Sequence, residues 1–282
     1  MTINCKGNLL DLSTPKVMGI LNITPDSFFD GGKYKNNTEI IIQTETMLAN
    51  GASIIDIGAY SSRPGADHVS EEEELNRIVP IVKLLLQTFP DILLSIDTFR
   101  SRVADECLTL GAAIVNDISA GNLDPQMLTV VGKHRAPYVM MHMKGTPKSM
   151  QSKTNYDNLI KEMLYFFSEK VAMARAQGVK DIIIDPGFGF AKTLEQNYEI
   201  LKKFDLLHSL NLPILAGISR KSMIFKLLGN SPDNALNGST ALHMYALSRG
   251  AKILRAHDVK EAWECIQLFK AIQDPYNIQD PI

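Results

Sequence analysis

Short apolar runs rich in Val and Ile recur along the whole chain and predict a series of β-strands. Eight of these runs stand out, at residues 17–23, 53–59, 92–96, 113–115, 138–141, 181–184, 213–216 and 252–254. Most are apolar at successive positions rather than at alternate ones, which is typical of strands that are covered on both faces. We therefore expect a parallel sheet enclosed by helices.

Helical patterns separate the apolar runs, with apolar residues spaced at i, i+3 and i+4. They cover residues 37–50, 70–88, 100–110, 125–134, 156–177, 193–208, 235–248 and 259–271. Several of them end at Gly51, Gly111, Gly178 or Gly250, and glycine is the residue that commonly follows the last turn of a helix. The chain thus alternates between strand and helix from one end to the other.

The strand–helix unit repeats eight times at roughly 35 residues, which is close to the length of a βα repeat. Right-handed crossovers close eight parallel strands into an α/β fold, the (β/α)8 TIM barrel, and this is the fold we expect. A doubly wound sheet is the rival, but such a sheet usually carries a GxGxxG or GxxxxGK[ST] phosphate loop, and the sequence has neither. No linker divides the chain, so we expect one domain over residues 1–282, with a coil tail at 273–282.

The charge balance argues against a partner that is nucleic acid or a membrane surface. Lys and Arg number 29 and Asp and Glu number 31, which gives a net charge of −2, whereas both partners require a cationic face. Cys5, Cys107 and Cys265 are far apart and form no CxxC pair, as in a reduced protein. No stretch has the length and apolar character of a signal peptide or a membrane span, so we expect a cytoplasmic protein.

In a (β/α)8 barrel, the functional side chains come from the carboxyl ends of the strands. Asp97, Asn116 and Asp185 stand at the ends of three expected strands. Their carboxylates and carboxamide suit a flat heterocycle rich in N–H donors, such as a 2-amino-4-oxopyrimidine edge. Two alternatives remain open: each residue taken singly is more often the N-cap of the next helix, and together they can form an internal network with neighbouring Arg or Lys side chains.

Positive charge gathers at the same predicted rim. Arg220 and Lys221 follow the seventh strand, and Arg255 and His257 leave the eighth strand on one side of it. Cations are disfavoured at the amino end of a helix, so a bound phosphate or diphosphate explains Arg220 and Lys221 better than solvent exposure does. The sequence has no zinc or iron ligand pattern, whereas a Mg²⁺ ion held by few protein oxygens and a substrate phosphate leaves little trace in a sequence.

Seven short motifs carry most of these residues. They are MGILNITPDSF at 18–28, SSRPG at 61–65, SIDT at 95–98, NDISAG at 116–121, DPGFGF at 185–190, GISRK at 217–221 and RAHDV at 255–259. In sequence and in order they closely resemble the motifs of the dihydropteroate synthase family of folate biosynthesis. Each motif alone is weak, but the whole set in register is highly specific and extends over essentially the whole chain.

This resemblance implies a (β/α)8 fold, usually as a homodimer, and a transferase. The implied reaction condenses (7,8-dihydropterin-6-yl)methyl diphosphate with 4-aminobenzoate to give 7,8-dihydropteroate and diphosphate. The implied cofactor is Mg²⁺, and the implied partners are small-molecule substrates. A sulfonamide that mimics 4-aminobenzoate is expected in the aminobenzoate pocket.

The resemblance also assigns roles to individual residues. The pterin-binding positions are Asp97, Asn116, Met141, Asp185 and Lys221. The diphosphate-binding positions are Asn22, Arg255 and His257, and Asn22 is also the expected Mg²⁺ ligand. The aminobenzoate-binding positions are Ser62, Arg63, Pro64, Phe190 and Ser222. Catalytic roles fall on Asn22, Asp30, Arg63, Lys221, Arg255 and His257. The chain departs from the family at Ser62, where Thr is common, which keeps the hydroxyl group and loses a methyl group.

Two other functions share part of this pattern. A methyltetrahydrofolate-binding methyltransferase has a similar Asp, Asn and Asp pocket for pterin, but it does not need the SRK and RxH anion set or the TPDSF loop that are present here. A catalytically silent relative that senses pterin or folate is expected to have lost a loop residue or an anion ligand, and the sequence retains them.

Overall fold

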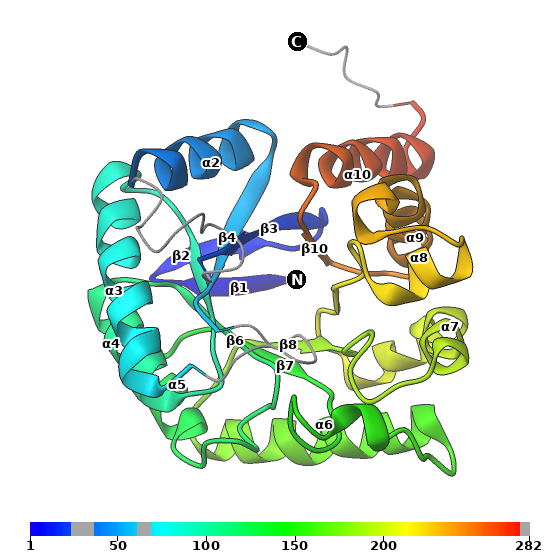
Figure 1. The fold of residues 1–282 in the computed structure, drawn as a ribbon, viewed down its shortest axis with the longest axis horizontal. Helices are drawn as coiled ribbons and strands as arrows, with labels where there is room; N and C mark the ends of the chain where they lie inside the picture. Colours follow the sequence, from blue (N-terminus) through cyan, green and yellow to red (C-terminus); the bar gives the residue numbers. More distant parts are fainter. Residues whose placement is uncertain (24–36, 61–68, 277–282) are drawn as a thin grey trace.

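The eight expected strands form a closed parallel barrel in the computed structural model, which describes residues 1–23, 37–60 and 69–276 (Figure 1). The strands are β3 (Lys16–Asn22), β4 (Ala52–Gly58), β5 (Leu94–Asp97), β6 (Ile114–Asp117), β7 (Tyr138–Met141), β8 (Ile182–Asp185), β9 (Leu215–Ala216) and β10 (Ile253–Ala256). Their order is β8-β7-β6-β5-β4-β3-β10-β9. A bridge between Ile184 and Ile214, with Ile184 N–H donating to Pro213 O at 3.0 Å, joins β8 to β9 and closes the ring. The (β/α)8 prediction is confirmed.

Helices surround the barrel. They are α2 (Asn37–Ala49), α3 (Glu71–Thr88), α4 (Ser101–Leu110), α5 (Met127–His134), α6 (Leu159–Ala176), α7 (Leu194–Lys202), α8 (Ser222–Leu227), α9 (Leu236–Ser248) and α10 (Val259–Gln273), with short 3₁₀ turns at Met150–Ser152, Phe204–Leu210 and Pro232–Asn234. Among the helices of the described ranges, none combines the length and the apolar composition of a transmembrane helix.

Four parts of the observed fold differ from the prediction. The predicted helix at 193–208 is α7 followed by a separate 3₁₀ segment. Helix α8 begins directly after Lys221, where the sequence analysis placed a helix amino end without giving the helix a range. Helix α10 includes Gln273, so the helix extends into the stretch expected to be coil, of which residues 277–282 lie outside the described ranges. An antiparallel hairpin of β1 (Thr2–Cys5) and β2 (Asn8–Asp11) precedes the barrel and was not predicted.

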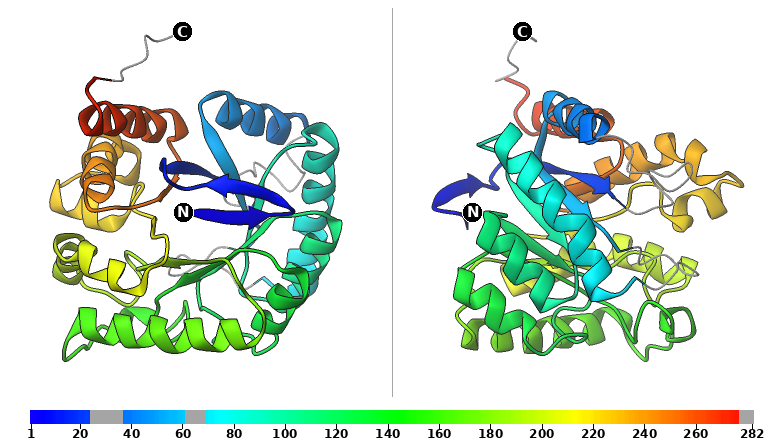
Figure 2. Two further views of the ribbon diagram at one scale, coloured as in Figure 1. Left: turned by 180° about the vertical axis from the view of Figure 1, so that it is seen from behind. Right: turned by 60° about the vertical axis from the view of Figure 1, so that its left-hand side comes forward.

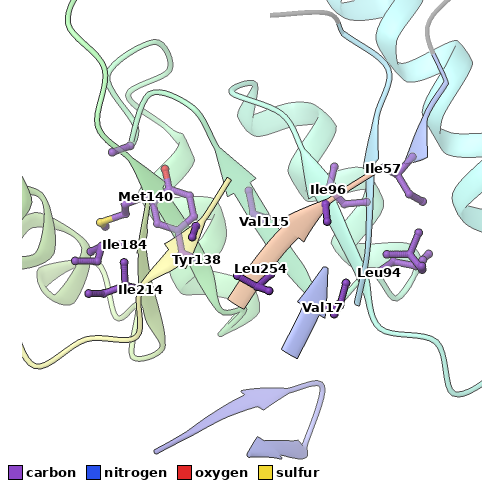
Figure 3. Close-up of a cluster of buried hydrophobic side chains, with 14 of the residues drawn as sticks. Val17, Ile57, Leu94, Ile96, Val115, Tyr138, Met140, Ile184, Ile214 and Leu254 are labelled. Atoms are coloured by element: carbon purple, nitrogen blue, oxygen red, sulfur yellow. The ribbon is translucent and has the colours of Figure 1, made fainter. Parts of the chain in front are cut away.

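The main hydrophobic core lies between the barrel and its helices. The side chains that face outward from the strands are buried there, as Figure 3 shows for Ile57, Ile96, Val115, Met140 and Ile184. Every second residue of a strand points to this side, because side chains alternate between the two faces of a sheet. The residues between them therefore face into the barrel.

A second, smaller apolar cluster fills the amino-terminal half of the barrel interior. Its strand residues are Met18, Ile54, Ile114, Val139, Ile183, Leu215 and Ile253. Ile3, Cys5 and Leu12 from the hairpin segment pack against them, so that the hairpin covers this end of the barrel (Figure 2). Consequently the opposite end, where the strands terminate, is the end available for a site.

His243 on α9 is buried without a compensating hydrogen bond from the described residues. Only 1% of it is exposed, and neither ring nitrogen has a hydrogen-bond partner. Burial lowers the pKa of this imidazole to about 4, because the charged form loses its hydration. The histidine is therefore neutral in the folded protein at neutral pH.

Shortening a hairpin side chain that packs against the barrel interior should destabilise the fold. We expect Ile3→Ala, at a side chain that is 2% exposed, to lower the free energy of unfolding by about 2–5 kcal/mol, because the deletion leaves a cavity that the rigid strands cannot fill. Urea titration measures the change. Leu9→Ala on the same hairpin, at a side chain that is 70% exposed, is the control and should change little. Equal losses in the two variants would show that the hairpin does not seal the barrel.

Acid should destabilise the protein partly through His243. Its folded-state pKa lies below that of the unfolded chain, so the unfolded state binds a proton first and stability declines as pH falls from about 6.5 towards 4. We expect His243→Leu to reduce the slope of unfolding free energy against pH in this window by about 1.4 kcal/mol per pH unit. An unaltered slope in His243→Leu would contradict the assignment.

Candidate active site

Strand alternation places the predicted residues on one inner surface. Counting by twos from the buried interior cluster leads from Ile114 to Asn116, from Ile183 to Asp185, from Val139 to Met141 and from Ile253 to Arg255. The same count leads from Met18 to Asn22 and, on β5, places Asp97 beside Asn116 in register. Six of the predicted site residues thus share the inner wall near the carboxyl ends of the strands.

The residue that follows Asn116 shows the opposite orientation. Asp117 lies on the outward side of β6, where its carboxylate accepts hydrogen bonds from the Tyr138 hydroxyl at 2.6 Å and from the backbone N–H groups of Ser119 and Gly121 at 2.7 and 2.8 Å. Asp117 therefore organises the turn after β6. Its neighbour Asn116 faces the barrel interior and is 4% exposed.

The centre of the inner wall is a network of charged and polar groups. Arg255 donates from Nε to Asp56 Oδ2 at 2.6 Å and from Nη2 to Asp97 Oδ2 at 2.6 Å. Asn116 Nδ2 donates to the same Asp56 oxygen at 2.9 Å. Arg255 of the predicted cationic set is therefore bonded to Asp97 of the predicted acidic set, and Asp56 links Arg255 to Asn116. This is the internal network that the sequence analysis left open as an alternative.

Asp56 is the site-wall residue that sequence analysis missed. It lies on β4 within an apolar run, between Ile54 and Gly58, and is completely buried. The prediction considered only residues that follow each apolar run. A carboxylate inside such a run was the available signal, because burial of an acid without a function or a partner is unfavourable.

Burial raises the pKa of Asp97, and the positive charge of Arg255 opposes this rise. Burial also raises the pKa of Asp185, against the hydrogen bond that Asp185 Oδ1 accepts from Gly187 N–H at 2.7 Å and against the charge of Lys221. Arg255 acts on the same carboxyl. Asp185 and Arg255 both face the barrel interior at the carboxyl ends of their strands, at the single rim that the sequence analysis predicted.

Lys192 fixes the loop that follows β8. Its Nζ donates to the backbone carbonyls of His142 at 3.1 Å, Gly187 at 2.9 Å and Phe190 at 2.8 Å, in a position that is 6% exposed. Burial lowers the pKa of this ammonium group to about 7. By joining the ends of β7 and β8, Lys192 holds Phe190 beside the inner wall.

An apolar floor adjoins the charged wall. Met141, Ile118 and Met143 are buried in a common cluster against which Phe190 packs. Lys221 Nζ lies 4.4 Å from the centre of the Phe190 ring, in a cation–π contact. The predicted residues Met141, Phe190 and Lys221 are therefore brought together. The predicted residue Ser222 lines a hollow whose other lining residues include Gly189, Asn197 and Lys226, and to which these three do not contribute.

Two contacts tie the loop after β9 to the end of β10. Ser219 Oγ accepts from His257 N–H at 3.1 Å and lies 3.2 Å from His257 Nδ1. Arg220 donates from Nε and Nη2 to both carboxylate oxygens of Asp258 at 2.9 and 2.5 Å. The Arg220 guanidinium is thus paired with Asp258 and holds the loop that carries Lys221. A part for Arg220 in binding a polyanion stays a prediction.

Asn22 completes the described rim. A methyl group placed on Gly58 would lie 3.7 Å from Asn22 Oδ1 and 3.5 Å from Asp97 Oδ2, so these two oxygens flank Gly58. Among residues 1–23, 37–60 and 69–276, no three or more His, Cys, Asp or Glu side chains converge in a group that could hold a metal ion. The remaining predicted site residues, Asp30, Ser62, Arg63 and Pro64, lie outside the described ranges.

Known proteins are similar to this chain in both sequence and fold. A family profile described as "Pterin binding enzyme" matches residues 18–257. Dihydropteroate synthase of Escherichia coli is 42% identical over 273 residues, which cover 96% of each chain.

Two solved structures of related enzymes superpose closely. The Yersinia pestis dihydropteroate synthase in a sulfonamide drug complex is 43% identical, with a TM-score of 0.91 over 97% of this chain and 99% of that one. The Xanthomonas albilineans enzyme in complex with 7,8-dihydropteroate is 35% identical, with a TM-score of 0.87 over 97% and 99% of the two chains. The chain described here belongs to the dihydropteroate synthase family.

Proposed function

We propose that the protein joins (7,8-dihydropterin-6-yl)methyl diphosphate to 4-aminobenzoate, releasing diphosphate and 7,8-dihydropteroate. The observation that carries this proposal is the convergence of Asp97, Asn116, Asp185 and Arg255 on one inner wall. Lys221 lies in the adjoining loop, against Phe190. The related Xanthomonas albilineans enzyme binds 7,8-dihydropteroate on the same fold, which supports this choice of product.

The pterin ring matches the inner wall in its hydrogen-bonding groups. Its 2-amino group and ring N–H groups are donors, and the carboxylates of Asp97 and Asp185 are acceptors when ionised. Lys221 supplies a donor for the 4-oxo group. Met141, on the apolar floor, provides a contact surface for the flat ring.

The diphosphate is assigned to the cationic edge of the same wall. Arg255 and His257 leave β10 two residues apart and therefore face one side. The Asn22 side-chain oxygen lies at the same rim, and a carboxamide oxygen together with diphosphate oxygens is a donor set that suits Mg²⁺. When bound, Mg²⁺ would supply charge neutralisation to the departing diphosphate.

Departure of the diphosphate is the step that these residues favour. Arg255, His257 and the Asn22 amide stabilise negative charge as the methylene C–O bond breaks. The electron-rich dihydropterin ring delocalises the resulting positive charge, and Asp97 and Asp185 place negative charge around that ring. The amine of 4-aminobenzoate then forms the new C–N bond, and the anilinium product loses its proton to diphosphate or to solvent. The reaction needs no dedicated general base.

The second substrate is assigned to Phe190 and Ser222, by analogy with the family motifs. Ser62, Arg63, Pro64 and Asp30 would complete this pocket, by analogy with the family motifs. A sulfonamide resembles 4-aminobenzoate in shape and charge, so we propose that it competes there, consistent with the sulfonamide complex of the Yersinia pestis enzyme.

A turnover assay tests the proposed function directly. The purified protein is given the pterin diphosphate and 4-aminobenzoate, with and without Mg²⁺, and formation of 7,8-dihydropteroate is followed. We expect steady turnover that depends on both substrates. Methyl transfer from methyltetrahydrofolate in place of this reaction would favour the methyltransferase, and tight pterin binding without turnover would favour a sensor.

Loss of the Asp185 carboxylate should strongly weaken pterin binding. We expect Asp185→Ala to weaken binding of the pterin diphosphate by about 10- to 100-fold, the effect of losing hydrogen bonds to a charged group. Calorimetric titration measures the affinity. Arg63→Ala is the matched control: it should impair use of 4-aminobenzoate and leave pterin affinity nearly unchanged. Near-normal pterin affinity in Asp185→Ala would refute the assignment of this residue.

Asn22→Ala should separate the metal requirement from pterin recognition. We expect the Mg²⁺ concentration that gives half-maximal turnover to rise about tenfold, the usual scale for losing one oxygen donor or its support. Affinity for the pterin alcohol, which lacks the diphosphate, should stay the same. An unchanged Mg²⁺ requirement would remove Asn22 from the proposed metal site.

A further inference from the structure

Asp56 occupies an unusual position for an acid. It is fully buried on β4, two residues beyond the apolar interior cluster at Ile54. Its Oδ1 has no hydrogen-bond partner among the described residues, although a buried carboxylate oxygen ordinarily has one. A group this costly to bury needs a function that an apolar side chain cannot supply.

The other oxygen of Asp56 joins two residues that face different parts of the substrate. Oδ2 accepts from Asn116 Nδ2 at 2.9 Å and from Arg255 Nε at 2.6 Å. Asn116 belongs to the proposed pterin subsite, and Arg255 belongs to the proposed diphosphate subsite. One buried atom is therefore shared by the two halves of the site.

We propose that Asp56 is a positioning residue that fixes the Asn116 amide and the Arg255 guanidinium relative to each other, so that the pterin ring and its diphosphate are held in a single geometry. This inference rests on the proposed function and deepens it. Asp56 acts through its two neighbours and need not touch the substrate.

The chemistry of the contact fixes the orientation of Asn116. An ionised carboxylate can only accept hydrogen bonds, so the amide must turn its NH₂ group towards Asp56. The Asn116 oxygen is then the amide atom left to accept a hydrogen bond from a pterin N–H group. Without Asp56 the amide could rotate by half a turn and present a donor where an acceptor is required.

Arg255 is oriented in the same way. Asp56 accepts a hydrogen bond from Arg255 Nε, and Asp97 accepts one from Arg255 Nη2. Carboxylates from two neighbouring strands therefore hold two edges of the planar guanidinium. A planar group held at two edges has little freedom to rotate. The guanidinium face and its remaining N–H donors therefore keep a constant direction for an anion.

Simple charge neutralisation of Arg255 is the competing explanation for Asp56. Asp97 already supplies a carboxylate to the same guanidinium, and neutralisation does not require the contact with Asn116. The two explanations differ in what they predict for the pterin half of the site. Only positioning makes pterin affinity depend on Asp56 through Asn116.

Double-mutant cycles with two probes test the proposal. The probes are the pterin alcohol that lacks the diphosphate, and inorganic diphosphate with Mg²⁺, each titrated by calorimetry. We expect Asp56→Ala to weaken binding of both probes by about tenfold or more. In an Asn116→Ala background it should change pterin-alcohol affinity by less than about twofold, and in an Arg255→Ala background the same should hold for diphosphate.

Asp56→Asn and Ser95→Ala complete the experiment. Asp56→Asn keeps the size and one acceptor oxygen, so it should fold and bind both probes with affinities between those of wild type and Asp56→Ala; it replaces Asp56→Ala in the cycles if the latter does not fold. Ser95 pairs with Asp56 in register on β5, is fully buried, and has a hydroxyl group without a hydrogen bond among the described residues. Ser95→Ala should therefore leave both affinities unchanged.

The outcomes distinguish this inference from the function on which it rests. Wild-type protein that binds neither probe would overturn the proposed function and the inference together. Wild-type binding with unchanged affinities in Asp56→Ala, or fully additive losses in both cycles, would overturn the role of Asp56 alone. Loss of diphosphate affinity with normal pterin affinity would identify Asp56 as a neutralising partner of Arg255 and would also overturn the proposal.

Discussion

The pleat of the β-strand is the constraint on which the whole site depends. Because successive side chains point to opposite faces, each strand sends one set of residues to the helices and the other set into the barrel. Near the strand starts the inward set is apolar and is covered by the hairpin, and near the strand ends it is polar. A shift of one residue in β6, for example, would replace Asn116 by Asp117 on the inner wall and destroy the arrangement.

Burying the polar groups of the inner wall costs hydration free energy, and these groups are stable only as a connected hydrogen-bonded network. Arg255 lies between Asp56 and Asp97, and Asn116 shares an oxygen of Asp56 with it. Burying any one of these charges alone would be strongly unfavourable, whereas the bonded set compensates much of the loss of hydration. Groups fixed in this way meet a substrate already oriented, which is how an enzyme stabilises charge that develops during a reaction. Lys192 and the Arg220–Asp258 ion pair fix the surrounding loops in the same way, through hydrogen bonds made by charged groups.

Local patterns were sufficient to predict the barrel and most of its inner rim. The eight apolar runs correspond to β3–β10, and the residues at their carboxyl ends include Asp97, Asn116 and Asp185. Features that depend on distant contacts could not be read in this way. The hairpin strands have four residues each and α8 has six, so each is too short to show a clear periodic pattern. Arg220 forms an ion pair with Asp258, which is 38 residues away in the sequence. Asp56 was missed because its partners, Arg255 and Asn116, are distant in the sequence, and the role of an acid within an apolar run follows from those contacts.

The division of acidic residues between the two faces of the strands can be measured directly. Asp97 faces inward and Asp117 faces outward, both at the ends of adjacent strands. The decisive measurement is the pterin affinity and the unfolding free energy of Asp97→Asn and Asp117→Asn, side by side. The inward variant should lose pterin affinity and remain folded, while the outward variant should lose stability and retain pterin affinity. The reverse pattern, or equal loss of pterin affinity in both variants, would contradict the assignment of the inner wall as the binding site.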